Sequence, residues 1–533
     1  MKPKLLLPLT ALALLFGAPA AANAAVTSVK LENGTFTVNA DGAADTVTIT
    51  AVNGKLQHNL GAVAGLAGNT DFDPNTPDVQ QPADDGTLQV AVNAGDGNDT
   101  INLSGANLGD STINGEGGDD IIVGSDNFDV INGGAGNDRM TGFKNPNGGP
   151  VEKINGDDGN DVMIWNNGDG FDENNGGAGV DETLVTAGTA DDDMTVDVSG
   201  TKTKFHRNNA PFGVDMDQVE KLSITSFSGN DKLVTGAGVT IPMSIDAGSG
   251  DDTITTGDGA DVVNGGDGND TLNGGNGGDR LVGDRGADTM NGGNGDDTTV
   301  WNNGDGSDVM NGDAGTDRVE NNLGAGADVS TVKNENGRVR YDRTNVGPFS
   351  LSIATAEVFA INSLGGDDSL TVAPDVTLPL DVDAGDGNDT MNLRGVSADF
   401  AFGGGGNDTA IVDATDSVAG IEAVDRPVVA PAPPAGVATI GKTVKVKKGV
   451  ASLTVSCPGG TAGCNGTVSL LTAKPVKLGR VRAQLLLGRA SFALKAGETS
   501  TIQVKLASGT ARLAKKKKLA AVTDAKAKVT LRF

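Results

Sequence analysis

The pattern of apolar and polar positions repeats every nine residues between Asp246 and Asp317. Each unit contains a glycine, an aspartate two residues later, and then a position two residues further on that is apolar in five of the first six units. The glycines permit sharp turns, and the short apolar part can form a strand with one side chain pointing inward. The pattern therefore predicts a stacked repeat structure in which two nonapeptides complete one coil.

The aspartates of this pattern occur in three stretches of the chain. In the central stretch they are Asp252, Asp261, Asp270, Asp279, Asp288, Asp297, Asp308 and Asp317. In an earlier stretch, which an insertion around residues 144–152 interrupts, they are Asp99, Asp120, Asp129, Asp138, Asp161, Asp172 and Asp181. A third, shorter stretch contributes Asp389 and Asp408.

Stacked aspartates create an electrostatic problem that a cation can solve. With two nonapeptides in one coil, Asp252 would lie above Asp270, and Asp261 would lie above Asp279 on the opposite edge. Rows of carboxylates repel one another unless a cation lies between them. Ca²⁺ suits such a gap, because it accepts about six to eight oxygen ligands in flexible geometry.

Two units carry the pattern nearly complete, namely NGGDGNDTL (Asn264–Leu272) and NGGNGGDRL (Asn273–Leu281). They resemble the glycine-rich nonapeptide of RTX-type, or hemolysin-type, calcium-binding proteins. The resemblance implies an all-β fold with a parallel β-roll or β-helix solenoid. It also implies that Ca²⁺ is the cofactor between the turns and that the seventeen aspartates named above are its ligands.

A longer repeat alternates these rolls with strand-rich spacers of about sixty residues. The only two tryptophans, Trp165 and Trp301, lie in its two copies, and FHRNNAPF at Phe205 corresponds to YDRTNVGPF at Tyr341. The tryptophans could form a platform for stacking carbohydrate. We favour a packing role, because the nine-residue register changes to eleven residues at both positions. An architecture of this kind stacks into a solenoid.

Charge divides the chain into two parts. The segment from Val437 onward holds 19 Lys/Arg and 2 Asp/Glu, which leaves 40 − 19 = 21 basic and 70 − 2 = 68 acidic residues before it. The net charges are therefore +17 and −47. The acidic part suits metal cations and argues against nucleic acid as a partner. The low aromatic content of 3% and the 80 glycines would also be compatible with disorder, but the regular phase of Asp and Gly favours folding that depends on bound metal.

The first 24 residues have the features of a secretion signal. Lys2 and Lys4 precede an apolar run from Leu5 to Phe16, and Ala22-Asn23-Ala24 forms a cleavage site of the A-x-A type. We therefore expect a secreted, extracellular protein, either free or associated with the cell surface. No later stretch is long and apolar enough to span a membrane.

Motifs for catalysis are missing from the sequence. It contains no H-E-x-x-H motif of zinc proteases and no G-x-S-x-G motif of lipases. His206 has Asp342 at the matching position of the second copy, which favours a surface or packing role. We therefore expect no enzyme. The alternative is an extracellular hydrolase that acts on polysaccharide and uses the roll as a stabilising module.

The composition changes at a Pro/Ala linker, after which short alternating strands follow. They predict an immunoglobulin-like β-sandwich, which is similar to small C-terminal modules of secreted actinobacterial proteins. Cys457 and Cys464 would form a disulfide, since two thiols make a poor zinc site. The basic run Lys515–Lys518 could bind anionic cell-wall polymers, lipid headgroups or the acidic roll, or could simply be a solvated face.

The predicted organisation has nine parts, and its predicted function is calcium binding with a structural or adhesive role outside the cell. The parts are a signal peptide (1–24), an N-terminal β region (25–92), a calcium-binding roll (93–186), a β spacer (187–245), a second roll (246–318), a second spacer (319–380), a short third roll (381–425), a Pro/Ala linker (426–436) and a basic immunoglobulin-like module (437–533).

Overall fold

The computed structural model describes most of the chain in strands, turns and bends. The described residues are 27–32, 34–52, 55–60, 85–142, 151–210, 212–345, 347–426, 438–447, 450–457, 464–472, 476–478, 481–483, 486–495, 497–507, 519–523 and 529–531. The predicted signal peptide, nearly all of the Pro/Ala linker and Lys515–Lys518 lie outside them. The described residues include no helix, and hence none that is long and apolar enough to cross a membrane.

The chain forms two compact units. The N-terminal unit contains the described residues up to Thr299 together with Asn311–Thr316, and the C-terminal unit contains Val300–Met310 and the described residues from Asp317 onward. The chain passes from the N-terminal to the C-terminal unit within β26 (Thr298–Asn302), returns within β27 (Val309–Ala314) and passes again after Thr316.

The N-terminal unit is a parallel β-solenoid whose strands lie in two sheets. Sheet 1 contains β1 (Ser28–Glu32), β2 (Thr35–Asn39), β5 (Gln89–Asp96), β7 (Ser111–Gly117), β9 (Asp129–Ala135), β11 (Glu152–Asp158), β13 (Phe171–Ala178), β15 (Asp193–Ser199), β16 (Lys202–Arg207), β17 (Phe212–Asp217), β19 (Lys232–Thr235), β21 (Thr253–Thr255), β23 (Thr271–Asn273) and β25 (Thr289–Asn294). Sheet 2 contains β3 (Thr46–Val52), β4 (Lys55–His58), β6 (Thr100–Asn102), β8 (Ile121–Val123), β10 (Arg139–Thr141), β12 (Val162–Asn166), β14 (Glu182–Thr186), β18 (Lys221–Thr225), β20 (Met243–Asp246), β22 (Val262–Asp267) and β24 (Arg280–Arg285).

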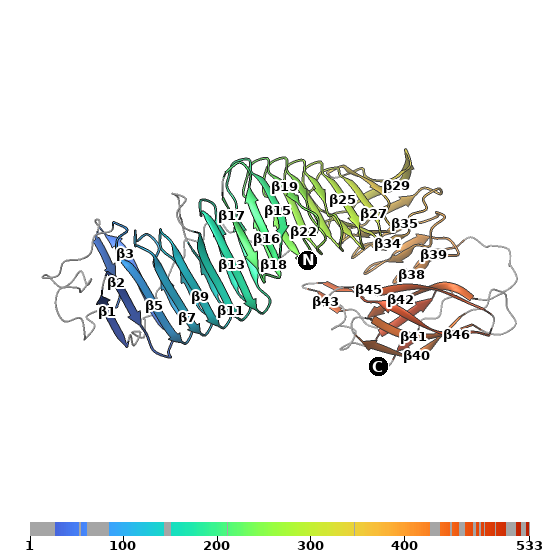
Figure 1. Cartoon of the computed structure of the whole chain (residues 1–533). Coiled ribbons are helices and arrows are strands. Elements are labelled where there is room, and N and C mark those ends of the chain that lie inside the picture. The colour runs from blue at the N-terminus through green and yellow to red at the C-terminus, as the bar shows by residue number, and fades with distance from the viewer. Residues whose placement is uncertain are drawn as a thin grey trace. The chain divides into compact units, whose positions relative to one another are not determined.

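Each coil of the rolls uses one strand of each sheet, and successive coils pair in parallel. In the second roll Thr253 pairs with Thr271, and Thr271 pairs with Thr289, so that one coil spans eighteen residues as the nonapeptide pattern predicts. Figure 1 shows the corresponding order β5, β7, β9, β11 and β13 in the first roll. Alternate side chains point into the core, which explains the alternating burial along each strand.

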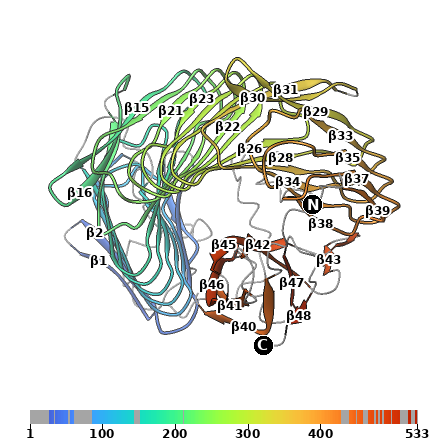
Figure 2. The ribbon, with the colours of Figure 1, turned by 90° about the vertical axis from the view of Figure 1, so that its right-hand side faces the viewer.

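The C-terminal unit has the same architecture, and its solenoid strands belong to the same two sheets. Sheet 1 contains β29 (Val329–Glu335), β30 (Arg338–Arg343), β31 (Phe349–Ala354), β33 (Ser369–Val372), β35 (Thr390–Asn392), β37 (Thr409–Ile411) and β39 (Ala423–Asp425). Sheet 2 contains β28 (Arg318–Asn322), β32 (Val358–Asn362), β34 (Leu380–Asp383), β36 (Phe400–Phe402) and β38 (Ser417–Ala419). Figure 2 shows β29, β33, β35 and β37 in their paired order.

The two spacers form antiparallel meanders within sheet 1. In the first, β15 pairs antiparallel with β16 and β16 with β17, while the outer strands pair in parallel with β19 and β13. In the second, β29, β30 and β31 pair antiparallel in the same order, and β29 pairs in parallel with β33. We call these segments the first and second meander. Their strands pair with strands that are adjacent in the sequence, whereas the strands of the rolls pair with those of the preceding and following coils.

Large aromatic side chains fill the core beside the meanders. Trp165 is fully buried and its ring meets the edge of Phe205 at 5.6 Å between centroids. Trp301 is also fully buried and stacks on Phe349 with centroids 3.7 Å apart. The packing role of both tryptophans is confirmed, because buried indoles cannot form a carbohydrate platform.

The N-terminal end of the solenoid consists of two antiparallel hairpins. β1 pairs with β2, which continues in parallel to β5, and β3 pairs with β4 and continues in parallel to β6. The ring of His58 stacks on Phe36 at 5.7 Å, so this histidine belongs to the packing of the end. The sequence from Asn69 to Gly86 is rich in Pro and Asp and predicts a polar loop, but its residues up to 84 lie outside the described part of the chain.

Beyond the solenoid, the C-terminal unit holds three small antiparallel sheets. One contains β40 (Thr439–Lys447), β41 (Val450–Ser456) and β46 (Thr499–Lys505), with β41 in the middle (Figure 2). Another contains β45 (Leu486–Leu494), β42 (Cys464–Thr472), β47 (Leu519–Thr523) and β48 (Val529–Leu531), and β43 (Val476–Leu478) pairs with β44 (Val481–Ala483).

The two larger sheets share one apolar core. Leu453 and Val504 of one sheet and Val468 and Leu487 of the other belong to the same buried cluster. A disulfide joins Cys457 and Cys464 at the edge of this cluster. The immunoglobulin-like topology itself stays a prediction.

Candidate metal centres along the turns

The seventeen predicted ligand aspartates are all buried, and none exposes more than 2% of its surface. Most lie immediately before or at the start of a strand, where a turn enters one of the two sheets. Burial of so many carboxylates without paired cations is costly, because the charged form loses its hydration. The hydrogen bonds and charges around these carboxylates therefore determine which ligand the turns can bind.

In the second roll, the backbone connects each aspartate to the aspartate one coil further on. The N–H of Asp252 donates to Oδ1 of Asp270, and the N–H of Asp270 donates to Oδ1 of Asp288, both at 2.8 Å. We call a series of carboxylates connected in this way a carboxylate row. On the opposite edge a second row runs from Asp261 through Asp279 to Asp297, again with distances of 2.8 Å.

The first roll contains a longer row with the same geometry. It begins at Asp45 and runs through Asp99, Asp120, Asp138, Asp161 and Asp181, with N–H to Oδ1 distances of 2.5–2.8 Å. In the C-terminal unit a row runs from Asp328 through Asp368 and Asp389 to Asp408, at 2.7–3.0 Å.

Glutamates end these rows. The N–H of Asp181 donates to Oε2 of Glu220 at 2.9 Å, and the N–H of Asp408 donates to Oε2 of Glu422 at 2.8 Å. In the C-terminal unit the N–H of Asp317 donates to Oε2 of Glu357 at 2.6 Å. The longer glutamate side chain reaches the last N–H from a coil whose turn lacks the nonapeptide form.

The second carboxylate oxygen, Oδ2, of the row aspartates does not accept the backbone N–H that connects the coils. In ten of these aspartates it is buried and finds no hydrogen-bond partner among the residues that the structure describes. This holds for Oδ2 of Asp99, Asp120, Asp138, Asp161, Asp181, Asp252, Asp270, Asp279, Asp389 and Asp408. Buried polar atoms in folded proteins almost always have partners, so a series of such oxygens indicates positions suited to a cationic ligand.

A carbonyl oxygen lies close to this second carboxylate oxygen. A Cβ atom built on Gly274 would lie 2.5 Å from Oδ2 of Asp279 and 2.6 Å from the carbonyl oxygen of Gly292 in the next coil. A Cβ on Gly292 would meet Oδ2 of Asp297 and the carbonyl oxygen of Gly312 at 2.5 and 2.7 Å. The first glycine of the unit thus leaves its space to two oxygens of the types that bind Ca²⁺.

The electrostatics of the metal-free rows agree with this geometry. Desolvation raises the pKa of Asp120, Asp138, Asp161 and Asp270 from 3.8 to about 6, although the backbone N–H bond lowers it in part. The pKa of Asp99 and Asp252 rises to about 7, and that of Asp279 to about 8, because neighbouring row carboxylates add their repulsion to desolvation. A bound cation would remove this penalty.

Asp129 and Asp172 belong to a different group on the opposite edge of the first roll. Glu152 lies between them in register, in the place that an aspartate occupies elsewhere. Both carboxylate oxygens of Glu152 and of Asp172 are buried and lack a hydrogen-bond partner within the described part of the chain, whereas Asp129 accepts bonds from Ser125. Desolvation and the charges of Asp172 and Asp129 raise the pKa of Glu152 to about 11.

Sequence reasoning missed several members of the rows. The row of the second roll starts before Asp252, at Asp192 and Asp231, with N–H to Oδ1 distances of 2.7 and 2.6 Å. Asp328 and Asp368 play the same parts in the C-terminal unit. The segments SGNDKL and GGDDSL do carry the aspartate and the apolar position two residues later, and this signal could have identified Asp231 and Asp368.

The remaining predicted ligands occupy related positions. Asp308 is buried at the start of β27, where its N–H donates to the carbonyl oxygen of Ser350 at 3.1 Å. Within the described residues, no three His, Cys, Asp or Glu side chains form a compact metal-binding group. Two carboxylates from successive coils and turn carbonyls are the donors that the rows offer.

Comparison with known protein families identifies repeats in the two rolls. A family model described as the RTX calcium-binding nonapeptide repeat matches residues 114–142, 244–272 and 273–299. The chain thus contains RTX nonapeptide repeats within a β-solenoid, and the matched segments hold nine of the seventeen predicted aspartates. No curated protein matches the chain.

The close approach at Gly274 predicts that a methyl group there disturbs the row. We expect Gly274→Ala to destabilise the calcium-loaded protein by about 1–3 kcal/mol, because the new Cβ collides with a backbone carbonyl. Thermal unfolding at saturating calcium measures the effect. Gly326→Ala is the matched control, since a Cβ atom built there would have no heavy atom within 4 Å. Equal unfolding temperatures for the two variants would contradict this account.

The raised pKa values predict the pH dependence of the metal-free protein. Below pH 3.8 the row carboxyls are protonated in both the folded and the unfolded chain. Above pH 3.8 the unfolded chain has released these protons, while the folded chain keeps them up to about pH 6 to 8. The free energy of unfolding therefore falls as the pH rises over this range. In a chelator we therefore expect a higher denaturant midpoint at about pH 5 than at about pH 7.5. An unchanged or rising midpoint would refute the role of buried carboxyls.

Proposed function

We propose that this chain is a secreted calcium-binding protein with a structural or adhesive role outside the cell. In this proposal its rolls bind several Ca²⁺ ions between successive turns and become rigid when they do so. The observation that carries the proposal is the series of buried Oδ2 atoms without hydrogen-bond partners in the described rolls. The RTX repeats within the same segments support calcium as the ion.

The row aspartates would hold the ion through Oδ2, with turn carbonyls as further donors. Calcium would supply positive charge to a site that otherwise buries carboxylates at a cost. Because the ion binds the folded coil and not the unfolded chain, binding energy becomes folding energy. Extracellular modules bind Ca²⁺ with dissociation constants of about 10⁻⁴–10⁻³ M, so even weak sites would fill after export.

The proposal assigns no reaction to the chain. The hydrolase considered above gains no support from the described residues, since the buried carboxylates of the rolls are explained by their place in the rows. The anionic polymers proposed as partners of the basic module stay a prediction, because Lys515–Lys518 lie outside the described residues.

A calcium titration followed by circular dichroism tests the proposal directly. We expect a cooperative gain of β signal with Ca²⁺ and none with Mg²⁺, which demands more regular geometry and dehydrates reluctantly. In Asp270→Asn the amide oxygen can still accept the N–H of Asp252, but the ligand charge is lost. The calcium midpoint should therefore rise by about tenfold or more.

Asp267→Asn provides the matched control for that variant. Asp267 is the last residue of β22, three residues before Asp270, and its side chain is 65% exposed and outside the row. Its removal should leave the midpoint unchanged. A metal-free chain that is already fully folded and indifferent to Ca²⁺ would exclude the proposal.

A further inference from the structure

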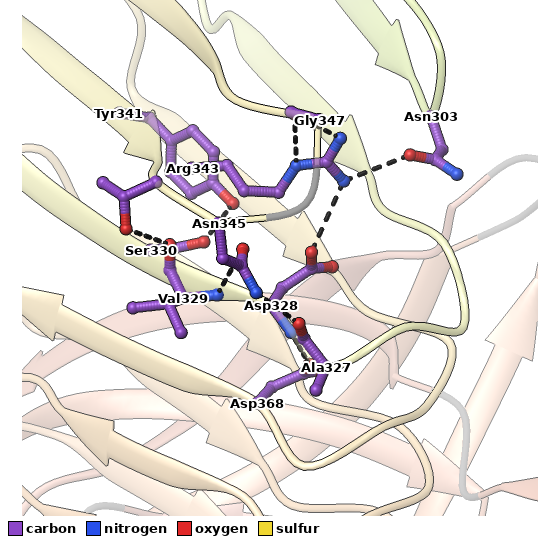
Figure 3. Close-up of polar contacts among 11 residues, drawn as sticks. Asn303, Ala327, Asp328, Val329, Ser330, Tyr341, Arg343, Asn345, Gly347 and Asp368 are labelled. Atoms are coloured by element: carbon purple, nitrogen blue, oxygen red, sulfur yellow. Dashed lines mark hydrogen bonds and ion pairs between the residues drawn. The ribbon is translucent and has the colours of Figure 1, made fainter.

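An arginine occupies the point in each meander where a carboxylate row begins. In the second meander, Arg343 at the end of β30 is almost fully buried, with 9% of its side chain exposed. Its Nη1 lies 3.4 Å from Oδ1 of Asp328 and donates to Oδ1 of Asn303 at 3.1 Å. Its Nε and Nη2 donate to the carbonyl oxygen of Gly347 at 3.0 and 2.8 Å (Figure 3).

Aromatic rings hold this guanidinium in place. It lies 4.7 Å from the ring centre of Phe349 and 5.6 Å from that of Trp301. Tyr341, two residues before Arg343, packs against Phe349, and its hydroxyl forms a hydrogen bond with Ser330 at 2.6 Å. Contacts of this kind fix a cation by cation–π attraction and packing as well as by charge.

The first meander repeats the arrangement with its own residues. Arg207, at the end of β16, forms an ion pair with Asp192 and a hydrogen bond with Asn167. The arginine side chain is 9% exposed and that of Asp192 is fully buried. The other oxygen of Asp192 accepts the N–H of Gly188 at 3.0 Å, so both of its oxygens have protein partners.

Both paired aspartates are the first members of a row. The N–H of Asp192 donates to Asp231, and that of Asp328 donates to Asp368. On the other side of each aspartate lies an antiparallel strand, β16 or β30, instead of another nonapeptide coil. No carboxylate of a preceding coil is therefore available among the described residues there to complete a calcium site, and the arginine supplies the positive charge.

We propose that Arg207 and Arg343 are fixed cations that take the place of calcium at the first aspartate of a row. Each meander then holds its fold without calcium and presents the first coil on which the adjoining roll assembles when calcium binds. This inference rests on the proposed calcium-dependent folding of the rolls. The meanders suit the task, because their antiparallel strands pair residues close in sequence, and such contacts form fastest.

Several partly buried charges of the meanders are also paired within the protein. Lys204 pairs with Asp215 in the first, and in the second Asp342 pairs with Arg340 and with Lys333. These meander carboxylates have ammonium or guanidinium partners, unlike the row aspartates of the rolls. These pairs neutralise part of the negative charge of the meanders within the chain itself.

Hydrogen–deuterium exchange of the full-length mature chain, read by mass spectrometry, tests the inference. In EDTA we expect peptides from the two meanders (193–217 and 329–353) to stay protected, while peptides from the roll at 246–299 exchange rapidly. Arg343→Met keeps the apolar stem and removes the charge. It should raise the exchange rate of the second meander in EDTA by about a hundredfold, since it leaves Asp328 buried without its cation.

The chain provides its own controls. In Arg343→Met the first meander, with Arg207 intact, should keep its protection, and Arg207→Met should give the reverse pattern. Arg340→Met removes a half-exposed arginine of the same strand and should change little. Arg343→Lys, which keeps a charge but loses the fork of donors, should fall between wild type and Arg343→Met.

The outcomes separate this inference from the proposed function. Rapid exchange of both meanders in EDTA, or unchanged protection in Arg343→Met, would overturn the role of the arginines. Rolls that stay protected in EDTA would overturn calcium-dependent folding instead, and the effect of Arg343→Met on the meander would still be measurable. If Arg343→Met does not fold, Arg343→Lys and Arg207→Met give the same comparison.

Discussion

The stacking of the coils and their need for positive charge both depend on one interaction, the hydrogen bond from a backbone N–H to the carboxylate of the next coil. It fastens each turn to its neighbour at both edges of the roll, for example between Asp252 and Asp270. It also places a carboxylate in the interior of the turn, where for ten of the row aspartates only one oxygen is satisfied among the described residues. The group that joins the coils is therefore also the group that makes them unstable without positive charge.

The molecule contains two different sources of that charge. In the rolls, desolvation of the buried row aspartates raises the pKa of Asp252 and Asp279, so that a proton or a bound cation would stabilise them. In the meanders the positive charge is built into the chain as Arg207 and Arg343. Two of the rows end at a glutamate, since Glu220 accepts the backbone N–H of Asp181 and Glu422 accepts that of Asp408.

The periodic part of this arrangement could be predicted from the sequence, because it depends on residues in fixed phase. The stacking of Asp252 over Asp270 and the packing role of Trp165 both follow from spacing. The irregular members of these series and the arginines at their starts could not be predicted in this way. Glu152 lies beside an insertion, and the partnership of Arg207 with Asp192 depends on an antiparallel return of the chain that no local period encodes.

Roll sequences that repeat so closely carry a hazard of their own. A strand displaced by one full coil of eighteen residues would meet nearly the same glycines, aspartates and apolar positions, so the pattern alone specifies the alignment weakly. The meanders have no such duplicate nearby, since each combines antiparallel strands with a tryptophan and an arginine found once per copy. A shift in the pairing register of one coil would therefore extend only to the next meander, because the meander can pair in a single register.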